Sequence, residues 1–289
     1  MQRIHTASNL SNSLDALRKD GKRIGFVPTM GALHKGHLAL IQQAAAANDI
    51  VVCSIFVNPA QFNDISDLNN YPRTLESDAA ALQSVHCDML FAPEVVEMYP
   101  NGPEQFEHTF GPIEQVMEGN HRPGHFSGMA LVVDKLFKMV MPHRAYFGEK
   151  DFQQLAIVKL LAAKFHPNME IVPCPTVREV DGLAMSSRNK LLSTIERAAA
   201  PKLYEVLLQI NEQIYSAPIE EVRMKALAEL NASPYIKTHY LEIVNSNTLQ
   251  PLTSWQDPAP WRACVAALIA DGSPTSKGVR IIDNFALKP

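Results

Sequence analysis

Strand and helix patterns alternate along residues 22–173, and this alternation restricts the fold more than any other feature. Residues 50–57 form a continuous apolar run rich in β-branched side chains, which is typical of a central strand buried on both faces. Further strands are predicted at 23–27, 89–92, 144–147 and 170–172, and helices at 38–47, 74–84, 128–140 and 152–165. Such alternation predicts an α/β doubly wound parallel sheet with helices on both faces.

The pattern changes after about residue 175. The capping-box sequence Ser193-Thr194-Ile195-Glu196 predicts the start of a helix that runs to about Tyr215, and a second helix is predicted at 219–230. Strands are predicted at 240–244, 263–270 and 279–282, and the Pro-rich stretch 251–260 is expected to be a loop. We therefore expect two domains, 1–175 and 176–289, of which the second is a smaller α+β domain.

Composition narrows the class of protein. The chain has 289 residues, a net charge of −4 and no long block of Lys or Arg, which argues against a nucleic-acid-binding protein. The N-terminus has no apolar signal segment, and the longest apolar stretches are too short to cross a bilayer. The four cysteines lack metal or redox spacing. We expect a reduced cytoplasmic protein with no membrane partner, although export by another route stays open.

The sequence His34-Lys35-Gly36-His37 stands where the predicted strand 24–27 passes through a Pro/Gly turn to a helix. A helix N-terminus carries unpaired N–H groups and a partial positive charge, so it suits a phosphate. Histidine adds hydrogen-bond donors, and Gly36 allows a close backbone approach. The alternative is a pair of capping or surface histidines. The spacing alone leaves both interpretations open.

Four further segments are unusually polar for their positions. Asn58 and Gln61 follow the central strand and suit a small polar substrate, or they form a turn at Asn58-Pro59. Lys150 and Asp151 follow Gly148 and suit a phosphate and a ribose hydroxyl, or they belong to an exposed charged loop.

The other two polar segments lie around residues 186–188 and 122–125. Ser186, Ser187 and Arg188 suit an anion clamp, or they form a linker between domains. The loop around Arg122 and His125 suits a substrate contact, or it is a solvated loop.

Six segments together, in this order, resemble the pantoate–β-alanine ligase (pantothenate synthetase) family, and the resemblance covers nearly the whole chain. They are residues 28–37, 56–62, 71–74, 121–126, 146–151 and 185–189. The family belongs to the nucleotidyltransferase superfamily, which carries HxGH and KMSKS-type motifs. Here the sequence Met185-Ser186-Ser187-Arg188 stands where a KMSKS-type loop would.

The resemblance implies a Rossmann-like N-terminal domain, a smaller C-terminal lid domain and a homodimer. It implies ATP with Mg²⁺, pantoate and β-alanine as substrates. The pantoate carboxylate would attack the α-phosphorus of ATP, giving pantoyl adenylate and pyrophosphate. The β-alanine amine would then displace AMP and give pantothenate, which is vitamin B5. Positioned hydrogen-bond donors would make the largest contribution to catalysis, because negative charge develops on the phosphates.

The resemblance also implies roles for individual residues. His34, His37 and Lys150 would be catalytic, with His37 the presumed proton donor and Lys150 stabilising the pentavalent transition state. The ATP site would consist of Met30, Gly31, Ala32, Leu33, His34, Lys35, Gly36, His37, Gly148, Glu149, Lys150, Asp151, Val177, Met185, Ser186, Ser187 and Arg188. Pantoate and β-alanine would meet Gln61, Gln154, Asn58, Arg122 and His125. Asp78 would lie near the magnesium ion.

Two places depart from the family pattern. Ser127 and Met129 stand where we expect a different small or acidic residue and a valine, and residues 271–278 form an extra polar loop. Two rival functions also remain: a nucleotidyl transferase acting on a phosphorylated acceptor, and a non-catalytic nucleotide sensor. A tRNA synthetase fragment is less expected, because the second domain lacks a strongly basic surface.

Overall fold

The computed structural model describes residues 1–62, 65–273 and 276–288. The chain divides into two compact units. The first consists of Met1–Glu149 and Gln153–Pro175, and the second of Lys150–Phe152 and Thr176–Pro289. The three residues Lys150–Phe152 therefore pack with the C-terminal unit although they precede the change of pattern at residue 175.

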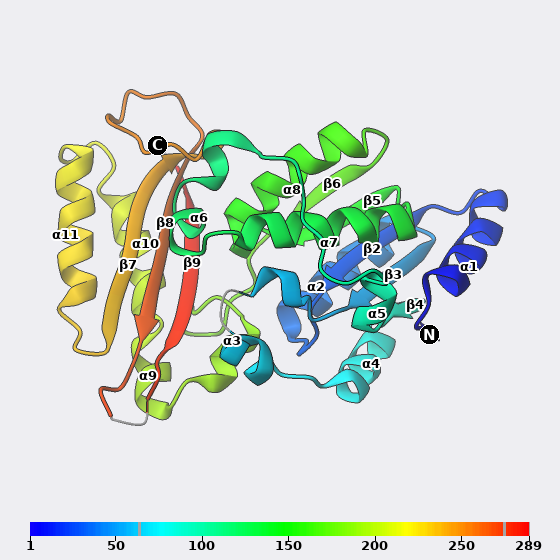
Figure 1. The fold of residues 1–289 in the computed structure, drawn as a ribbon. Helices are drawn as coiled ribbons and strands as arrows, with labels where there is room; N and C mark the ends of the chain where they lie inside the picture. The colour runs from blue at the N-terminus through cyan, green and yellow to red at the C-terminus, as the bar shows by residue number, and fades with distance from the viewer. Residues whose placement is uncertain (63–64, 274–275, 289) are drawn as a thin grey trace. The chain divides into compact units, whose positions relative to one another are not determined.

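The first unit is built on a six-stranded sheet in the order β1-β4-β3-β2-β5-β6, and every pair in it is parallel (Figure 1). This confirms the predicted parallel α/β architecture. Its strands are β1 (Gln2–Ile4), β2 (Ile24–Thr29), β3 (Ile50–Ile55), β4 (Met89–Phe91), β5 (Arg144–Gly148) and β6 (Glu170–Cys174).

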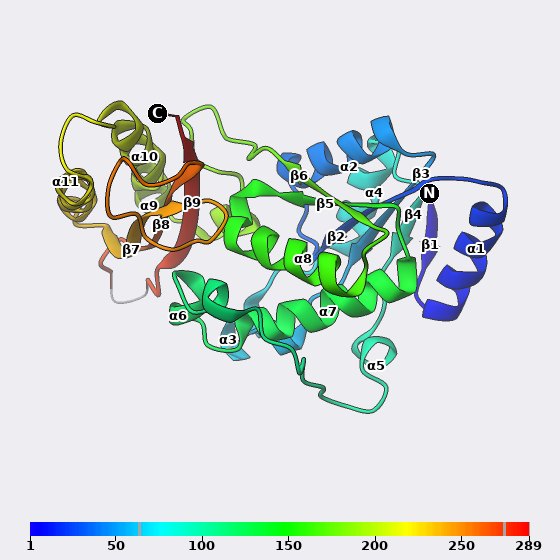
Figure 2. The same ribbon diagram turned by 90° about the horizontal axis from the view of Figure 1, so that it is seen from above.

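Helices cover both faces of this sheet. Figure 2 shows α2 and α4 on one face and α7 and α8 on the other. Alternate residues of β2 point to opposite faces, so Phe26 packs its ring against Phe137 of α7, whereas Val27 joins the core cluster that contains Ile41 of α2. The helices are α1 (Ala7–Lys19), α2 (Lys35–Ala47), α3 (Ile65–Asn70), α4 (Leu75–Ser84), α5 (Val95–Met98), α6 (Glu118–His121), α7 (His125–Val140) and α8 (Phe152–Phe165).

The order of the strands creates a switch point beside β2. The chain passes from β2 to β3 and then to β4 in one direction, and β5 pairs with the other side of β2. In open α/β sheets the crevice at such a point, at the carboxyl ends of the strands, is where ligands bind. The turn after β2 and the end of β5 at Gly148 therefore stand at the position that the topology favours for a site.

The second unit is a three-stranded antiparallel sheet in the order β7-β8-β9. Helices α10 and α11 pack on it through a core that includes Leu207, Leu230 and Ile281. Its elements are α9 (Thr194–Ala199), α10 (Lys202–Glu212), α11 (Ile219–Asn231), β7 (Ile236–Asn245), β8 (Trp261–Ile269) and β9 (Val279–Leu287). The predicted loop 251–260 lies between β7 and β8, as expected.

Several details of the sequence prediction were wrong, and three of them concern where helices begin and end. The helix expected from residue 193 to Tyr215 is two helices, because Pro201 has no N–H to donate and its ring crowds the carbonyl four residues before it. The helix expected at 38 begins at Lys35. Helix α1 was missed, although Thr6 caps it and Leu10 and Leu14 bury one side, because its remaining residues are mostly polar.

None of the described helices is long and apolar enough to cross a membrane.

Candidate active site

The turn that follows β2 is held in place by a carboxylate from α4. Gly31 and Ala32 both have positive φ angles, +83° and +50°. The two oxygens of Asp78 accept the backbone N–H groups of Ala32 at 2.9 Å and of Leu33 at 2.8 Å. A Cβ on Gly31 would lie 3.1 Å from Asp78 Oδ2, so the turn needs glycine at this position as well as the carboxylate.

His34 and His37 form a reciprocal cap at the start of α2. His34 is the N-cap, and its Nδ1 accepts the N–H of Gly36 at 3.2 Å. The Nδ1 of His37 accepts the N–H of His34 at 3.4 Å, and the two ring centroids lie 4.0 Å apart. Because both Nδ1 atoms accept, each neutral ring carries its proton on Nε2. The capping interpretation is therefore correct, and it is compatible with phosphate binding through the Nε2–H donors.

Asn58 and Gln61 meet in the 3-10 turn Pro59–Gln61 after β3. Asn58 is buried, and its Nδ2 donates to Gln61 Oε1 at 3.2 Å and to the Gly128 carbonyl at 3.0 Å. Its Oδ1 accepts the hydroxyl of Tyr99 at 2.6 Å and the N–H of Ala60 at 3.3 Å. Each side-chain polar atom of Asn58 thus has a partner in the protein, and the bond from its Nδ2 orients Gln61.

Gln61 links this turn to the turn after β2. Its Nε2 lies 2.8 Å from the sulfur of Met30. Helix α7 approaches the same turn closely, because a Cβ on Gly128 would lie 2.1 Å from the carbonyl oxygen of Ala60. Sequence reasoning missed this role of Gly128. The one available signal was a glycine near the start of an otherwise apolar helix.

Arg122 and His125 lie against the backbone of Gln61. His125 is buried, and its Nδ1 donates to the Gln61 carbonyl at 2.9 Å. Its Nε2 lies 3.1 Å from a guanidinium nitrogen of Arg122, which can only donate. His125 is therefore oriented as a neutral ring with the proton on Nδ1. The structure brings these two predicted residues to Gln61, in the first unit.

The neighbours Gln153 and Gln154 in α8 have different surroundings. Gln153 is buried, and its side chain donates to the carbonyls of Ile113 and Val116 at 2.8 Å each and accepts the N–H of Glu118 at 3.0 Å. Sequence reasoning missed this anchor. The side chain of Gln154, the predicted ligand, is half-buried and makes no hydrogen bond to any of the described residues.

Gly148 and Glu149 end the first part of the first unit, and the second unit carries Lys150, Asp151, Val177 and Met185–Arg188. Lys150 Nζ lies 3.4 Å from the carboxylate of Asp151. Residues 177–185 form a hairpin, with the Met185 N–H donating to the Val177 carbonyl at 3.0 Å. Ser186 then caps a 3-10 helix, Ser187–Leu191, by accepting the Arg188 N–H at 3.3 Å. Ser186, Ser187 and Arg188 thus form the capped start of a 3-10 turn.

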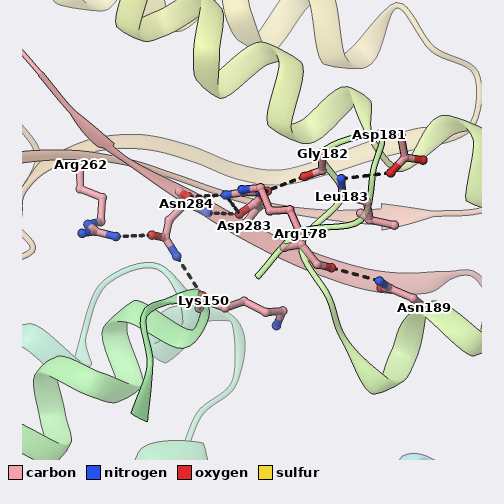
Figure 3. A network of polar contacts seen from close by, with 10 residues as sticks. Lys150, Arg178, Asp181, Gly182, Leu183, Asn189, Arg262, Asp283 and Asn284 are labelled. Carbon is pink, nitrogen blue, oxygen red and sulfur yellow. Dashed lines mark hydrogen bonds and ion pairs between the residues drawn. The ribbon is translucent and has the colours of Figure 1, made fainter. Parts of the chain in front are cut away.

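An ion pair fixes the hairpin to β9. Both terminal nitrogens of Arg178 donate to the carboxylate of Asp283, at 2.6 and 2.9 Å (Figure 3). The guanidinium carbon also lies 3.7 Å from the centroid of the Tyr204 ring. Burial raises the pKa of Asp283, and Arg178 opposes that shift. Neither residue was singled out from the sequence, because they lie 105 positions apart and form no local pattern.

The residues present do not fit a magnesium site built by the protein. Across residues 1–62, 65–273 and 276–288, no three His, Cys, Asp or Glu side chains gather to hold a metal ion. Asp78, which the resemblance placed near magnesium, uses both oxygens to hold the turn. Mg²⁺ commonly binds through substrate phosphates and waters instead of a full set of protein ligands.

The parallel sheet, the small antiparallel unit and the capped histidine pair define a two-unit α/β protein consistent with the nucleotidyltransferase superfamily. The family model described as pantoate-beta-alanine ligase matches residues 2–286. The chain therefore belongs to the pantoate–β-alanine ligase family.

Individual members of this family match the chain over nearly their full length. The chain is 46% identical to the pantothenate synthetase of Phocaeicola vulgatus over 289 residues, covering 100% of both chains. The crystal structure of pantothenate synthetase from Thermus thermophilus is similar with a TM-score of 0.91 at 43% identity, covering 100% of both chains. That of the Francisella tularensis ligase, complexed with β-γ ATP and β-alanine, has a TM-score of 0.80 at 38% identity, covering 99% of this chain and 97% of that one.

Proposed function

We propose that this protein condenses (R)-pantoate with β-alanine at the expense of ATP, giving pantothenate, AMP and pyrophosphate. The observation that carries the proposal is membership of the ligase family over residues 2–286. The histidine-capped start of α2 beside the switch point supports it, because a phosphate-bearing substrate suits that position.

In the first step, a carboxylate oxygen of pantoate attacks the α-phosphorus of ATP. A new O–P bond forms, the bond to the β-phosphate oxygen breaks, and pyrophosphate leaves, so that pantoyl adenylate remains. We assign ATP binding to the Met30–His37 turn, to Gly148–Asp151 and to Val177 with Met185–Arg188. The Nε2–H groups of His34 and His37 and the ammonium of Lys150 are the donors for the developing charge.

In the second step, the β-alanine amine attacks the acyl carbon, the C–O bond to AMP breaks and the amine loses a proton. We assign pantoate to Gln61 and Gln154, whose neutral amides suit a hydroxy acid better than a phosphorylated acceptor. That preference disfavours the rival transferase. Arg122 and His125, which lie against Gln61, are assigned to the β-alanine end.

Three further properties belong to the proposal. Magnesium arrives with the ATP phosphates, because the described side chains form no cluster that would hold it. The location is the cytoplasm, which suits the buried, free thiols of Cys53, Cys87 and Cys174. The assembly is a homodimer, which size-exclusion chromatography with light scattering tests directly.

Product analysis tests the proposed reaction. Purified protein supplied with ATP, Mg²⁺, pantoate and β-alanine should form AMP and pyrophosphate in equal amounts, with pantothenate. Formation of ADP and phosphate would contradict it, as would AMP formation that does not depend on pantoate. ATP binding without turnover would favour the sensor.

A further inference from the structure

Two C-terminal strands hold the short segment that contains Lys150. Asn284 on β9 donates its Nδ2–H to the backbone carbonyl of Lys150 at 2.9 Å. Arg262 on β8 donates to the side-chain oxygen of the same Asn284, and its guanidinium lies 3.8 Å over the ring of Phe152. Figure 3 shows Asn284 between Arg262 and Lys150. Residues 150–152 are thus held at both ends within the second unit.

Asn284 is itself fixed through its backbone. Its N–H donates to Asp283 Oδ1 at 2.7 Å, and its carbonyl accepts from Arg178 at 3.2 Å. Arg178 also donates to the Gly182 carbonyl at 3.0 Å, so the hairpin 177–185 is joined to the same point (Figure 3). A single asparagine therefore connects the Lys150 segment with the hairpin that leads to Met185.

We propose that Asn284 is a positioning residue for Lys150. The inference rests on the proposed adenylation, in which the Lys150 ammonium stabilises the transition state. Lysine has a flexible four-carbon side chain, so the place of its ammonium depends on where the main chain is anchored. The Asn284 bond supplies that anchor, and Arg262 orients the amide so that Nδ2 rather than Oδ1 faces the carbonyl. Asn284 acts only through Lys150.

The test uses the full-length protein with the substitution Asn284→Asp. This variant keeps an oxygen for Arg262 and replaces the donor to Lys150 with a second oxygen. Asn284→Ala is the second variant. It adds no charge beside Asp283, so the test still stands if the new carboxylate of Asn284→Asp disturbs folding. Ile281→Val on the same strand is the control, because Ile281 is buried and apolar. Thermal melts and circular dichroism establish that each variant is folded.

We expect Asn284→Asp and Asn284→Ala to lower the single-turnover rate of adenylation about tenfold, as losing one buried hydrogen bond can. The KM for ATP should change less than about twofold, because the lost interaction acts in the transition state. Amide hydrogen exchange in residues 149–154 should become faster. Ile281→Val should leave both the rate and the exchange as in the parent protein.

A double-mutant cycle with Lys150→Ala decides whether Asn284 acts through the lysine. The double variant should be no slower than Lys150→Ala alone. The inference is overturned if the double variant is slowed by the product of the two separate factors. It is also overturned if hydrogen exchange is unchanged in both Asn284 variants. If Lys150→Ala adenylates at the parent rate, the catalytic role of the lysine fails and the inference with it. If the parent protein makes no AMP at all, the proposed reaction fails, and exchange still reports whether Asn284 holds the segment.

Discussion

The carboxylate of Asp78 accepts the backbone N–H of Ala32 at 2.9 Å, and so a side chain from α4 fixes a residue with a positive φ angle in the turn after β2. A positive φ is unfavourable for alanine, and the bond from Asp78 helps to offset that cost. The hydrogen bonds to Asp78 therefore fix the backbone between β2 and His34 without a bound ligand. Asp78 is a structural element of the site.

Asp78→Asn should separate this role from that of a magnesium ligand. An amide keeps one acceptor and turns an NH₂ group toward a backbone N–H, so we expect the free energy of unfolding to fall by about 2 kcal/mol. The adenylation rate should fall with it, and the Mg²⁺ concentration for half-maximal rate should not change. Glu76→Gln on the same helix is the control, because its pair with Arg3 is exposed. Unchanged stability with a raised Mg²⁺ requirement would instead favour metal binding.

Gln153 and Gln154 provide a matched pair of neighbouring residues. Gln154→Ala should raise the KM for pantoate about tenfold, the effect of one lost ligand hydrogen bond, with little change in Tm. Gln153→Ala removes the anchor of residues 113–118 and should lower the Tm. Steady-state kinetics and thermal melts on both variants check this. The assignment of Gln154 fails if its variant binds pantoate as well as the parent protein.

Tyr99 should act on pantoate binding through Asn58. Burial raises the pKa of Tyr99, so its hydroxyl stays protonated and donates to Asn58 Oδ1. Tyr99→Phe should raise the KM for pantoate roughly threefold to tenfold, because Gln61 loses part of its support. Tyr146→Phe is the control: its hydroxyl accepts from Asn48 at 2.7 Å and has no bond to Asn58 or Gln61. Equal effects of both substitutions on the KM would show that only general stability is involved.

The buried thiols should make the protein sensitive to alkaline pH. Burial raises the pKa of Cys87 to about 12 and that of Cys174 to about 11. Above about pH 9 the unfolded chain loses these protons while the native state keeps them, so the native state binds more protons and stability falls as pH rises. The contribution is complete below pH 9 and declines toward pH 11–12, by up to about 1.4 kcal/mol per pH unit for each thiol. Urea titrations of Cys87→Ala should show a shallower decline than those of the parent protein, and an equal slope would refute this account.

The sequence predicted the elements whose signals are local. The β-branched run at 50–57 and the apolar helix at Phe152–Phe165 were recognisable because burial dictates their composition. The start of α2 was misplaced because histidine is not among the usual capping residues, so Lys35 to His37 were assigned to the turn.

Roles that depend on distant partners were hidden. Gln153 and Gln154 are identical in the sequence, and only the contacts of residues 113–118 make one an anchor. Likewise, Asn284 lies 134 positions from Lys150. The resemblance placed Asp78 near magnesium, but its hydrogen bonds to Ala32 and Leu33 could be seen only once α4 was placed beside the turn after β2.

Isotope transfer tests the central claim, that pantoate is activated as its adenylate, most directly. Pantoate labelled with ¹⁸O in both carboxylate oxygens is incubated with the protein, ATP, Mg²⁺ and β-alanine, and the products are analysed by mass spectrometry. Attack on the α-phosphorus followed by C–O cleavage predicts one ¹⁸O atom in each AMP and one in each pantothenate. AMP without ¹⁸O would contradict the account.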